Sequence, residues 1–383
     1  MKSRERVKRA FHYEKPDRVP MFSMNLIKSD FLYSILFNSK IWQPENYPPH
    51  VPGGVYSISK LYYRLLVYNW KKKFRKKAKY QKKWWKYPHT SIDEWNILWK
   101  SAGTESKDIT KGHPCFGPIQ DNWDNLINIK IPNGSNSDRF RLVRFKLWKI
   151  LAKNKYTVGA LDANGFFNLS SQLRGFNNIL IDFVRNSNKV HKLIDKLIPY
   201  FLDQIKEYKN QYPKLDAIYV ADDLGTQKSP FISPTIFNTF FRQPYKKIIN
   251  LTHDLDMDFI LHSCGQIFEL MPNIIDTGVD VFQFDSPLMT GVENFKLFSE
   301  QRKVAFWLSS NIQSTYVLGT PNDVENEIKY YIEQVGKREG GLAIHEYDSN
   351  STLGTPKENI IAQREATLKW GMYNQDGFID WLI

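Results

Sequence analysis

A histidine and a cysteine stand two residues apart in the segment FILHSCGQI, residues 259–267. If this segment is an extended strand, the side chains of His262 and Cys264 point to the same side of it. Imidazole nitrogen and thiolate sulfur are donors that zinc prefers, so the pair could supply two ligands of a metal site. The alternative is a buried cysteine beside a hydrogen-bonded histidine, because H-x-C is a short and common string.

Other polar and ionisable residues also stand where predicted strands end. They are Asp162, Asp222, Asp223, Asp285, Asn311, His345, Glu346 and Asp348. Adjacent strand residues face opposite ways, so one of Asp222 and Asp223 can face the site while the other caps a helix or bonds a loop. The sequence therefore predicts catalytic roles for Asp222 or Asp223, and for His345 as a general acid or base.

The elements that would position these residues alternate between short strands and longer helices. Strands are predicted at 18–24, 157–162, 216–223, 258–264, 279–285, 304–310 and 341–347. One intervening helix begins after Ser233, an N-cap residue followed by Pro234, and the last helix ends at Gly371. This alternation predicts a mostly parallel sheet with its helices outside.

Seven such strands are one short of a (β/α)8 TIM-type barrel, and the eighth is expected in the irregular region 90–155. A Rossmann fold is less favoured, because no G-x-G-x-x-G follows any predicted strand. We expect residues 1–383 to form one barrel domain, with a long helical, basic and aromatic elaboration at 28–110. In such barrels the chemistry lies at the carboxyl ends of the strands, where the residues above stand.

The charge of the chain is strongly basic, with a formal net charge of +13. The densest basic run, residues 69–87, follows an apolar pattern of helical spacing at 56–70. It predicts a solvated helical insertion, with attachment to a membrane surface as the alternative. No zinc-finger or RNA-binding signature accompanies it, so a nucleic-acid partner is not expected.

The two cysteines, Cys115 and Cys264, are too few for a disulfide framework, which indicates a reducing compartment. The first twenty residues hold no apolar run of the kind that a secretory signal needs, and no stretch is long and apolar enough to span a bilayer. We therefore expect a cytoplasmic protein.

Four segments resemble the uroporphyrinogen decarboxylase superfamily, in the same order along the chain. They are SRERVKRAFHYEKPDRVPMF, DDLGTQKSPFISPTIFNTFFRQPYKKII, HSCG with the following QIFELMPNIIDTGVDVFQFDSP, and GTPKENI. The resemblance spans residues 3–371, is weakest over 28–90, and implies a TIM-type barrel. One branch of the superfamily decarboxylates uroporphyrinogen without a cofactor. The other contains methylcobamide:coenzyme M methyltransferases and related corrinoid-dependent enzymes, which bind zinc through H-x-C and a later cysteine.

Each branch of the superfamily has characteristic residues that can be looked for in this sequence. The decarboxylases carry R-Q-A-G-R after the first strand, and the corresponding FSMNLIKSDF holds no arginine, although Arg174 and the basic insertion could compensate. The late cysteine of the methyltransferases is absent around GLAIHEYDSNSTLGTP, which leaves His345, Glu346 or Asp348 as a third metal ligand.

The resemblance thus implies a zinc-dependent methyltransferase that moves a methyl group between a corrinoid and a thiol or similar acceptor. The zinc ligands would be His262 and Cys264 with Glu346 or Asp348, and the substrate-binding residues Asp162, Arg174, Asp285 and His113. The corrinoid would sit on a separate protein, because no D-x-H-x-x-G pattern is present. The alternatives are decarboxylation of a tetrapyrrole or another polycarboxylate, and a non-catalytic barrel that binds tetrapyrrole or corrinoid. Barrels of this family often pair, so the resemblance also implies a homodimer.

Overall fold

The structure is a computed structural model of the 383-residue chain. It describes residues 1–25, 27–35, 90–100, 113–136, 140, 148–161, 164–301, 304–336, 339–347 and 350–373. Asp162, Asp348 and the basic run 69–87 lie outside these residues, as does most of the elaboration predicted at 28–110.

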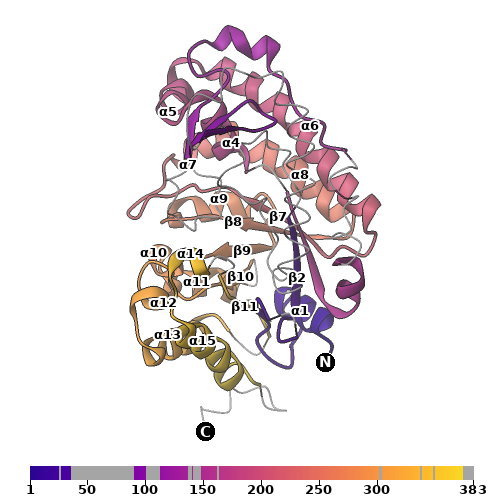
Figure 1. The fold of residues 1–383 in the computed structure, drawn as a ribbon, viewed down its shortest axis with the longest axis vertical. Coiled ribbons are helices and arrows are strands. Elements are labelled where there is room, and N and C mark those ends of the chain that lie inside the picture. Colours follow the sequence, from indigo (N-terminus) through magenta and orange to yellow (C-terminus); the bar gives the residue numbers. More distant parts are fainter. Residues whose placement is uncertain are drawn as a thin grey trace.

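Eight parallel strands form a nearly closed barrel, which confirms the predicted TIM-type fold (Figure 1). They are β1 (Met21–Phe22), β2 (Phe31–Ile35), β6 (Tyr156–Ala160), β7 (Ala217–Ala221), β8 (Asp258–His262), β9 (Val281–Phe284), β10 (Ala305–Leu308) and β11 (Leu342–His345). Their order in the sheet is β1-β11-β10-β9-β8-β7-β6-β2. The two end strands, β1 and β2, meet at a seam where the Asp30 N–H donates to the Met21 carbonyl oxygen at 2.9 Å.

The eighth strand is β2, and its place corrects the prediction from the sequence. The expected region, 90–155, holds instead a separate antiparallel sheet of β3 (Thr90–Ile92), β4 (Leu98–Lys100) and β5 (His113–Phe116). The five residues FLYSI of β2 pair in parallel with β6, from Phe31↔Tyr156 to Ile35↔Ala160. Residues 31–35 therefore belong to the barrel, although they lie inside the range predicted as an elaboration.

Helices surround the barrel and extend it on one side. They are α1 (Ser3–Phe11), α4 (Phe166–Arg174), α5 (Phe176–Arg185), α6 (Ser187–Gln211), α7 (Pro234–Phe240), α8 (Arg242–Asp254), α9 (Met271–Ile275), α10 (Pro287–Thr290), α11 (Val292–Glu300), α12 (Thr315–Leu318), α13 (Pro321–Gln334), α14 (Asn350–Leu353) and α15 (Lys357–Trp370), with 3-10 turns η2 (Trp123–Asn128), η4 (Ala152–Asn154) and η5 (Phe268–Leu270). The small sheet lies beside α4 and α5, at the top of Figure 1. No described helix is long and apolar enough to cross a membrane.

Local capping chemistry sets the helix ends as predicted. The Ser233 hydroxyl accepts a hydrogen bond from the Ile236 N–H at 3.3 Å, with Pro234 in the first helical turn of α7. Gly371 follows the last residue of α15. These ends start α7 and stop α15 at the positions that the sequence indicates.

Helix α1 covers the N-terminal ends of the strands. Its Arg4 pairs with Asp216, just before β7, at 2.7 Å, and the following His12 pairs with Asp258, the first residue of β8, at 2.8 Å. Aromatic side chains fill the barrel interior behind this helix, where Phe31 stacks on Trp307 with ring centroids 4.6 Å apart. The closed N-terminal end leaves the opposite, C-terminal mouth for a functional site.

The barrel seam is held at this same end by an ion-pair network that is buried around Asp30 and partly exposed at Asp17. The guanidinium of Arg6 binds both oxygens of Asp17, at 2.6 and 2.8 Å, and reaches Asp30 at 2.7 Å. Arg18 pairs with the other oxygen of Asp30 at 2.9 Å. Because the backbone of Asp30 bonds to both Met21 and Tyr156, this network stabilises the junction of β1 and β2.

Candidate functional site

Three potential metal ligands converge at the C-terminal mouth, where β7 and β8 end. Nε2 of His262 lies 3.3 Å from the Sγ of Cys264 and 3.4 Å from Oδ1 of Asp223. The three donor atoms lie within 4.8 Å of one another, and they form the one such cluster of three among the described residues. The imidazole is buried, whereas Cys264 is exposed and the Asp223 side chain is 45% exposed. The cluster can therefore hold a cation and still be reached from outside.

The electrostatics of the cluster favour positive charge between these atoms. Burial raises the pKa of Asp223, but the hydrogen bond and charge of His262 and the N–H of Cys264 lower it more strongly, to about 2. Burial alone would lower the pKa of His262, yet the negative charges beside it raise that pKa well above its ordinary value. Burial also raises the pKa of Cys264, so its thiol is neutral near pH 7 when no metal is bound. An imidazolium or a bound metal ion would satisfy the Asp223 carboxylate, and a metal ion would also favour the thiolate of Cys264.

Gln283 on β9 orients the imidazole from the other side. Its Nε2 donates to Oδ1 of Asp285 at 2.8 Å, so its Oε1 must face Nδ1 of His262, to which it is hydrogen-bonded. The Tyr219 hydroxyl also donates to this oxygen, at 3.2 Å. An amide oxygen only accepts, so Nδ1 carries a proton. Nε2 becomes a potential metal ligand once it loses the proton that it directs toward Asp223 when the ring is charged.

His345, predicted as catalytic, ends β11 but lies outside the cluster. Its ring stacks on Phe22 and meets Trp307 edge-on, with centroids 5.0 and 4.9 Å apart. Its Nε2 lies 3.9 Å from Oδ1 of Asp285, and its Nδ1 has no hydrogen-bond partner in the described part of the chain. Burial, together with the charge of His262, lowers its pKa to about 3, so the imidazole is neutral near pH 7.

The adjacent aspartates at the end of β7 have different surroundings. Asp222 is buried and accepts hydrogen bonds from the N–H groups of Phe167 and Asn168, at 3.0 and 2.8 Å, at the start of α4. The Tyr245 hydroxyl donates to it at 2.6 Å, and burial raises its pKa to about 6. Asp222 thus anchors a helix, while Asp223 faces the cluster.

Glu346, predicted as a metal ligand, is engaged elsewhere. Arg364 binds both of its carboxylate oxygens at 2.7 Å, and the Ser23 hydroxyl donates to it at 2.8 Å. The carboxylate is 1% exposed and its charge is balanced by the guanidinium. The structure does not bring Glu346 into the cluster. Asp348, the other predicted ligand, lies outside the described residues, as does Asp162.

Arg174, predicted to bind substrate, holds a neighbouring segment in place. Its guanidinium pairs with Asp182 at 2.7 Å and lies 4.8 Å from the ring centroid of Trp123. It also donates to the carbonyl oxygens of Ile119 and Gln120. These contacts fasten the segment after β5 to α4 and α5.

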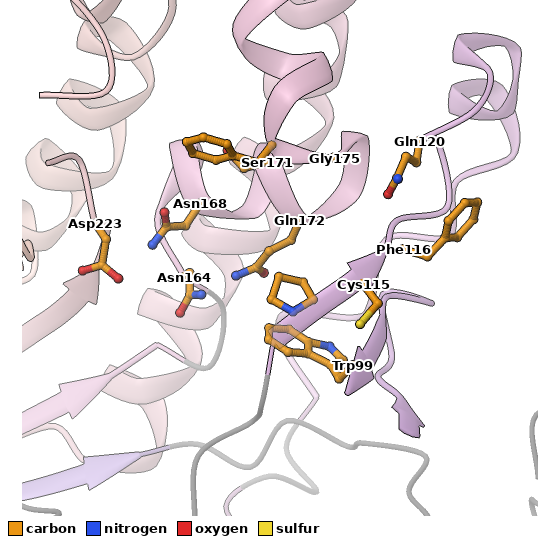
Figure 2. Close-up of a pocket in the computed structure, with 12 residues that line it drawn as sticks. Trp99, Cys115, Phe116, Gln120, Asn164, Asn168, Ser171, Gln172, Gly175 and Asp223 are labelled. Carbon is orange, nitrogen blue, oxygen red and sulfur yellow. The ribbon is translucent and has the colours of Figure 1, made fainter. Parts of the chain in front are cut away.

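A cavity of about 480 Å³ extends from the cluster toward the small sheet. Its lining is Trp99, Pro114, Cys115, Phe116, Gln120, Asn164, Asn168, Ser171, Gln172, Gly175, Phe176 and Asp223. Figure 2 shows Asp223 on one side, Trp99 and Cys115 on the other, and the amides of Asn164, Asn168 and Gln172 between them. The predicted substrate residue His113 begins the same strand as Cys115 but is not part of the lining.

Sequence reasoning missed Gln283 and the amides of this cavity. Gln283 lies two residues before Asp285 on β9, in an otherwise apolar strand, and that polar interruption was the available signal. Asn164, Asn168 and Gln172 follow β6 and enter α4, and isolated amides in such a segment carry no spacing signal.

Comparison with known proteins supports the family resemblance. A family model described as "Uroporphyrinogen decarboxylase (URO-D)" matches residues 100–368. No curated protein matches the chain. Among solved structures, the chain resembles a methyltransferase from Methanosarcina mazei, with a TM-score of 0.50 and 17% identity over 69% of this chain and 73% of that one. It also matches GMP reductase from Trypanosoma brucei in complex with guanosine 5'-triphosphate, at a TM-score of 0.27 and 11% identity over 45% and 39% of the chains. At 17% identity the match to the Methanosarcina mazei protein bears on the fold alone, and nothing is argued from the match to GMP reductase.

Proposed function

The chain belongs to the uroporphyrinogen decarboxylase family, and from that membership we propose that it is a zinc-dependent methyltransferase acting between a corrinoid and a thiol. The observation that carries this proposal is the convergence of Asp223, His262 and Cys264 at the barrel mouth. The methyltransferase fold of the Methanosarcina mazei protein is compatible with it.

The donor set fits zinc. Nitrogen, sulfur and carboxylate oxygen are all zinc donors, and a catalytic zinc site keeps three protein ligands and one open position. We assign the third ligand to Asp223, which lies 3.4 Å from His262 and was expected to be catalytic. Glu346, a ligand expected from the sequence, is already bound by Arg364 through both carboxylate oxygens. Zinc bound here would lower the pKa of an acceptor thiol and so favour its thiolate.

The protein groups around this site would position and shield the reactants. Gln283 holds Nε2 of His262 toward the ligand position, and Asn168 and Cys264 hold Asp223. Zinc held by His262, Cys264 and Asp223 would favour the thiolate of the acceptor, and the corrinoid would supply the methyl group. The corrinoid would be presented by a separate protein.

Zinc analysis of paired cysteine variants tests the proposal. Protein purified without affinity metal or chelator is expected to hold about one zinc per chain, as a three-ligand site requires. Cys264→Ser should lose most of this zinc, whereas Cys115→Ser, which changes the other exposed cysteine, should keep it. Circular dichroism checks that both variants are folded. Equal zinc in wild type and Cys264→Ser, or no zinc in the wild type, would contradict the proposal.

Decarboxylation is a second candidate, because the matching family model is that of the decarboxylases. Release of carbon dioxide from uroporphyrinogen by metal-free protein would support it. The absence of arginine from FSMNLIKSDF makes this outcome less expected, because bidentate guanidinium groups are the usual anchors for carboxylates. A folded protein with neither zinc nor carbon dioxide release would favour a non-catalytic barrel.

A further inference from the structure

The cavity beside Asp223 has a polar wall made of neutral amides. Four carboxamide residues line the cavity, and two of them, Gln120 and Asn168, are already hydrogen-bonded within the protein. Gln120 accepts a hydrogen bond from the Gly117 N–H at 3.1 Å. With its amide oriented to pair with the Asp223 backbone, Asn168 donates to that carbonyl at 3.2 Å and accepts from that N–H at 2.9 Å. These two amides therefore shape the wall and position Asp223.

The other two carboxamides are available to a ligand. Asn164 and Gln172 are half-buried, line the cavity, and form no side-chain hydrogen bond with another described residue. Figure 2 shows both amides pointing into the space between Asp223 and Cys115. Each carboxamide offers two donor hydrogens and an acceptor oxygen, so the pair can bind hydroxyl, carbonyl or amide groups.

Charge is scarce in the described lining. It contains no lysine or arginine, and its one carboxylate, Asp223, is bonded to His262 and the Cys264 N–H. A sulfonate, carboxylate or phosphate that entered the cavity would lose its hydration water and gain no cationic partner among these residues. An ammonium group would have to compete with His262, or with a metal ion, for the single carboxylate.

The remaining wall is aromatic. Trp99, Phe116 and Phe176 line the cavity, and Phe116 and Phe176 are 37% and 41% exposed. They offer apolar surface opposite the amides, and the volume of about 480 Å³ falls within the range of small-molecule sites.

From these features we propose that the acceptor thiol of this protein is uncharged. It would bear hydroxyl or amide groups that bind Asn164 and Gln172, and an apolar part that packs on Trp99, Phe116 and Phe176. The inference rests on the proposed methyltransferase function, because Asp223 joins the cavity to the cluster. It narrows the proposed acceptor class to neutral thiols, on the evidence of the described lining.

A charge series of small thiols tests the inference on the zinc-loaded, full-length protein. The probes are 3-mercaptopropionamide, 2-mercaptoethanol, 2-mercaptoethanesulfonate and cysteamine, which share a two-carbon spacer and differ in the charge of the end group. Dissociation constants come from isothermal titration calorimetry. The two neutral thiols are expected to bind at least about tenfold more tightly than the sulfonate or the ammonium thiol.

A charge-introducing variant sharpens the test. Gln172→Glu places a carboxylate in the wall at unchanged size, and should shift the preference toward cysteamine by about tenfold. The matched control is Asn177→Asp, the same kind of change at an exposed position of α5 outside the lining, which should leave the order unchanged. Removing the amides with Asn164→Leu should weaken the neutral thiols and leave the charged ones as before.

The outcomes separate the two proposals. Equal or tighter binding of the sulfonate or of cysteamine by wild-type protein would overturn the neutral-thiol inference, as would the absence of binding by every probe. The zinc content of the same sample reports independently on the metal site. A zinc-free protein would therefore contradict the proposed function before any thiol is added.

Discussion

The two ends of the barrel both concentrate ionisable residues, but they satisfy them in different ways. At the N-terminal end, cations and anions alternate and are paired, as in the Arg6, Asp17, Asp30 and Arg18 network. At the C-terminal mouth, Asp223, His262 and Cys264 turn their donor atoms toward one another.

The difference lies in what each arrangement leaves unsatisfied. The charge of Asp30 is balanced by Arg6 and Arg18 within the protein, so this end of the barrel serves stability at the junction of β1 and β2. Around His262 the partners are a carboxylate, a thiol and a neutral amide, so the cation that completes the set is either the protonated ring itself or a bound metal ion. Ionisable residues alone do not mark a candidate site, whereas donor atoms that converge so that a metal ion can replace a proton do.

The largest expected effect is on stability at the N-terminal end. Arg6→Met should lower the free energy of unfolding by about 3 kcal/mol, because it removes the partner that Asp17 and the buried Asp30 share. The loss should stay at the low end for a broken buried pair, because Asp30 keeps Arg18 and Asp17 keeps the N-terminal amine. Urea unfolding followed by circular dichroism measures the loss. The fraction of zinc bound by the folded variant should not change.

The control for this change is Arg9→Met on the same helix. Arg9 pairs with Glu5 at 2.9 Å with both side chains exposed, so its loss should cost about 0.5 kcal/mol or less. If Arg6→Met cost no more than Arg9→Met, the ion-pair network would not be what closes the seam.

An intermediate effect is expected at the mouth, from the residue that orients the imidazole. Gln283→Leu removes the acceptor for Nδ1 of His262 and should weaken zinc binding by roughly 10–100-fold. Competition with a chromophoric chelator measures the zinc affinity, and thermal unfolding of the metal-free protein is recorded beside it.

Gln363→Leu is the matched control for this substitution. Both glutamines are 1% exposed and hydrogen-bonded through both ends of the amide. Gln363 bonds to the N–H of Ser310 and to the carbonyl of His345, away from the cluster. The two variants should lose similar stability, and only Gln283→Leu should lose zinc affinity. A parallel loss of affinity in both would mean that Gln283 acts only through packing.

The smallest expected effect is a pH dependence at the N-terminal end. The hydrogen bond to Asp258 raises the pKa of His12 against the opposing effect of burial. The raised folded-state pKa adds stability that is fully present below the unfolded value of about 6.5 and is lost as the pH rises through the folded value. Because the ring is 43% exposed, the gain is screened to about 0.5 kcal/mol.

Denaturant unfolding of wild type and His12→Gln measures this contribution. The free energy of unfolding should be higher for the wild type than for the variant at about pH 6, and this difference should be smaller at about pH 9. A gap of the same size at both pH values would show that His12 contributes through packing instead of its charge.

The sequence was sufficient for most of the barrel because its buried strands are short apolar runs between helices of clear periodicity. Each of the seven predicted strands overlaps an observed one, from β1 within 18–24 to β11 within 341–347. The eighth, β2, follows β1 after only eight residues without a helix between them, so alternation of strand and helix does not reveal it. Its FLYSI sequence is apolar and aromatic, as strands are, but pairing with β6 depends on contacts far along the chain.

The site was less predictable for the same physical reason. The i, i+2 spacing of His262 and Cys264 is local, and the structure brings their donor atoms together. The identity of the third donor depends on which strands are neighbours in the barrel. Because β7 pairs with β8, Asp223 lies close to His262 and Cys264. Glu346, which follows β11, instead binds Arg364. Gln283 is a contact across strands as well, which no spacing in the sequence encodes.

The pairing of β1 with β11 has a consequence for how the protein is made. Met21 lies opposite Ile344, so the two partners are roughly 320 residues apart along the chain. At about 5–20 residues per second, a ribosome would release the partner of β1 some 16 to 65 seconds after β1 itself. During that interval β1 lacks its neighbour β11 and exposes an unpaired strand edge. Because β1 is only two residues long, it offers few backbone hydrogen bonds to another chain.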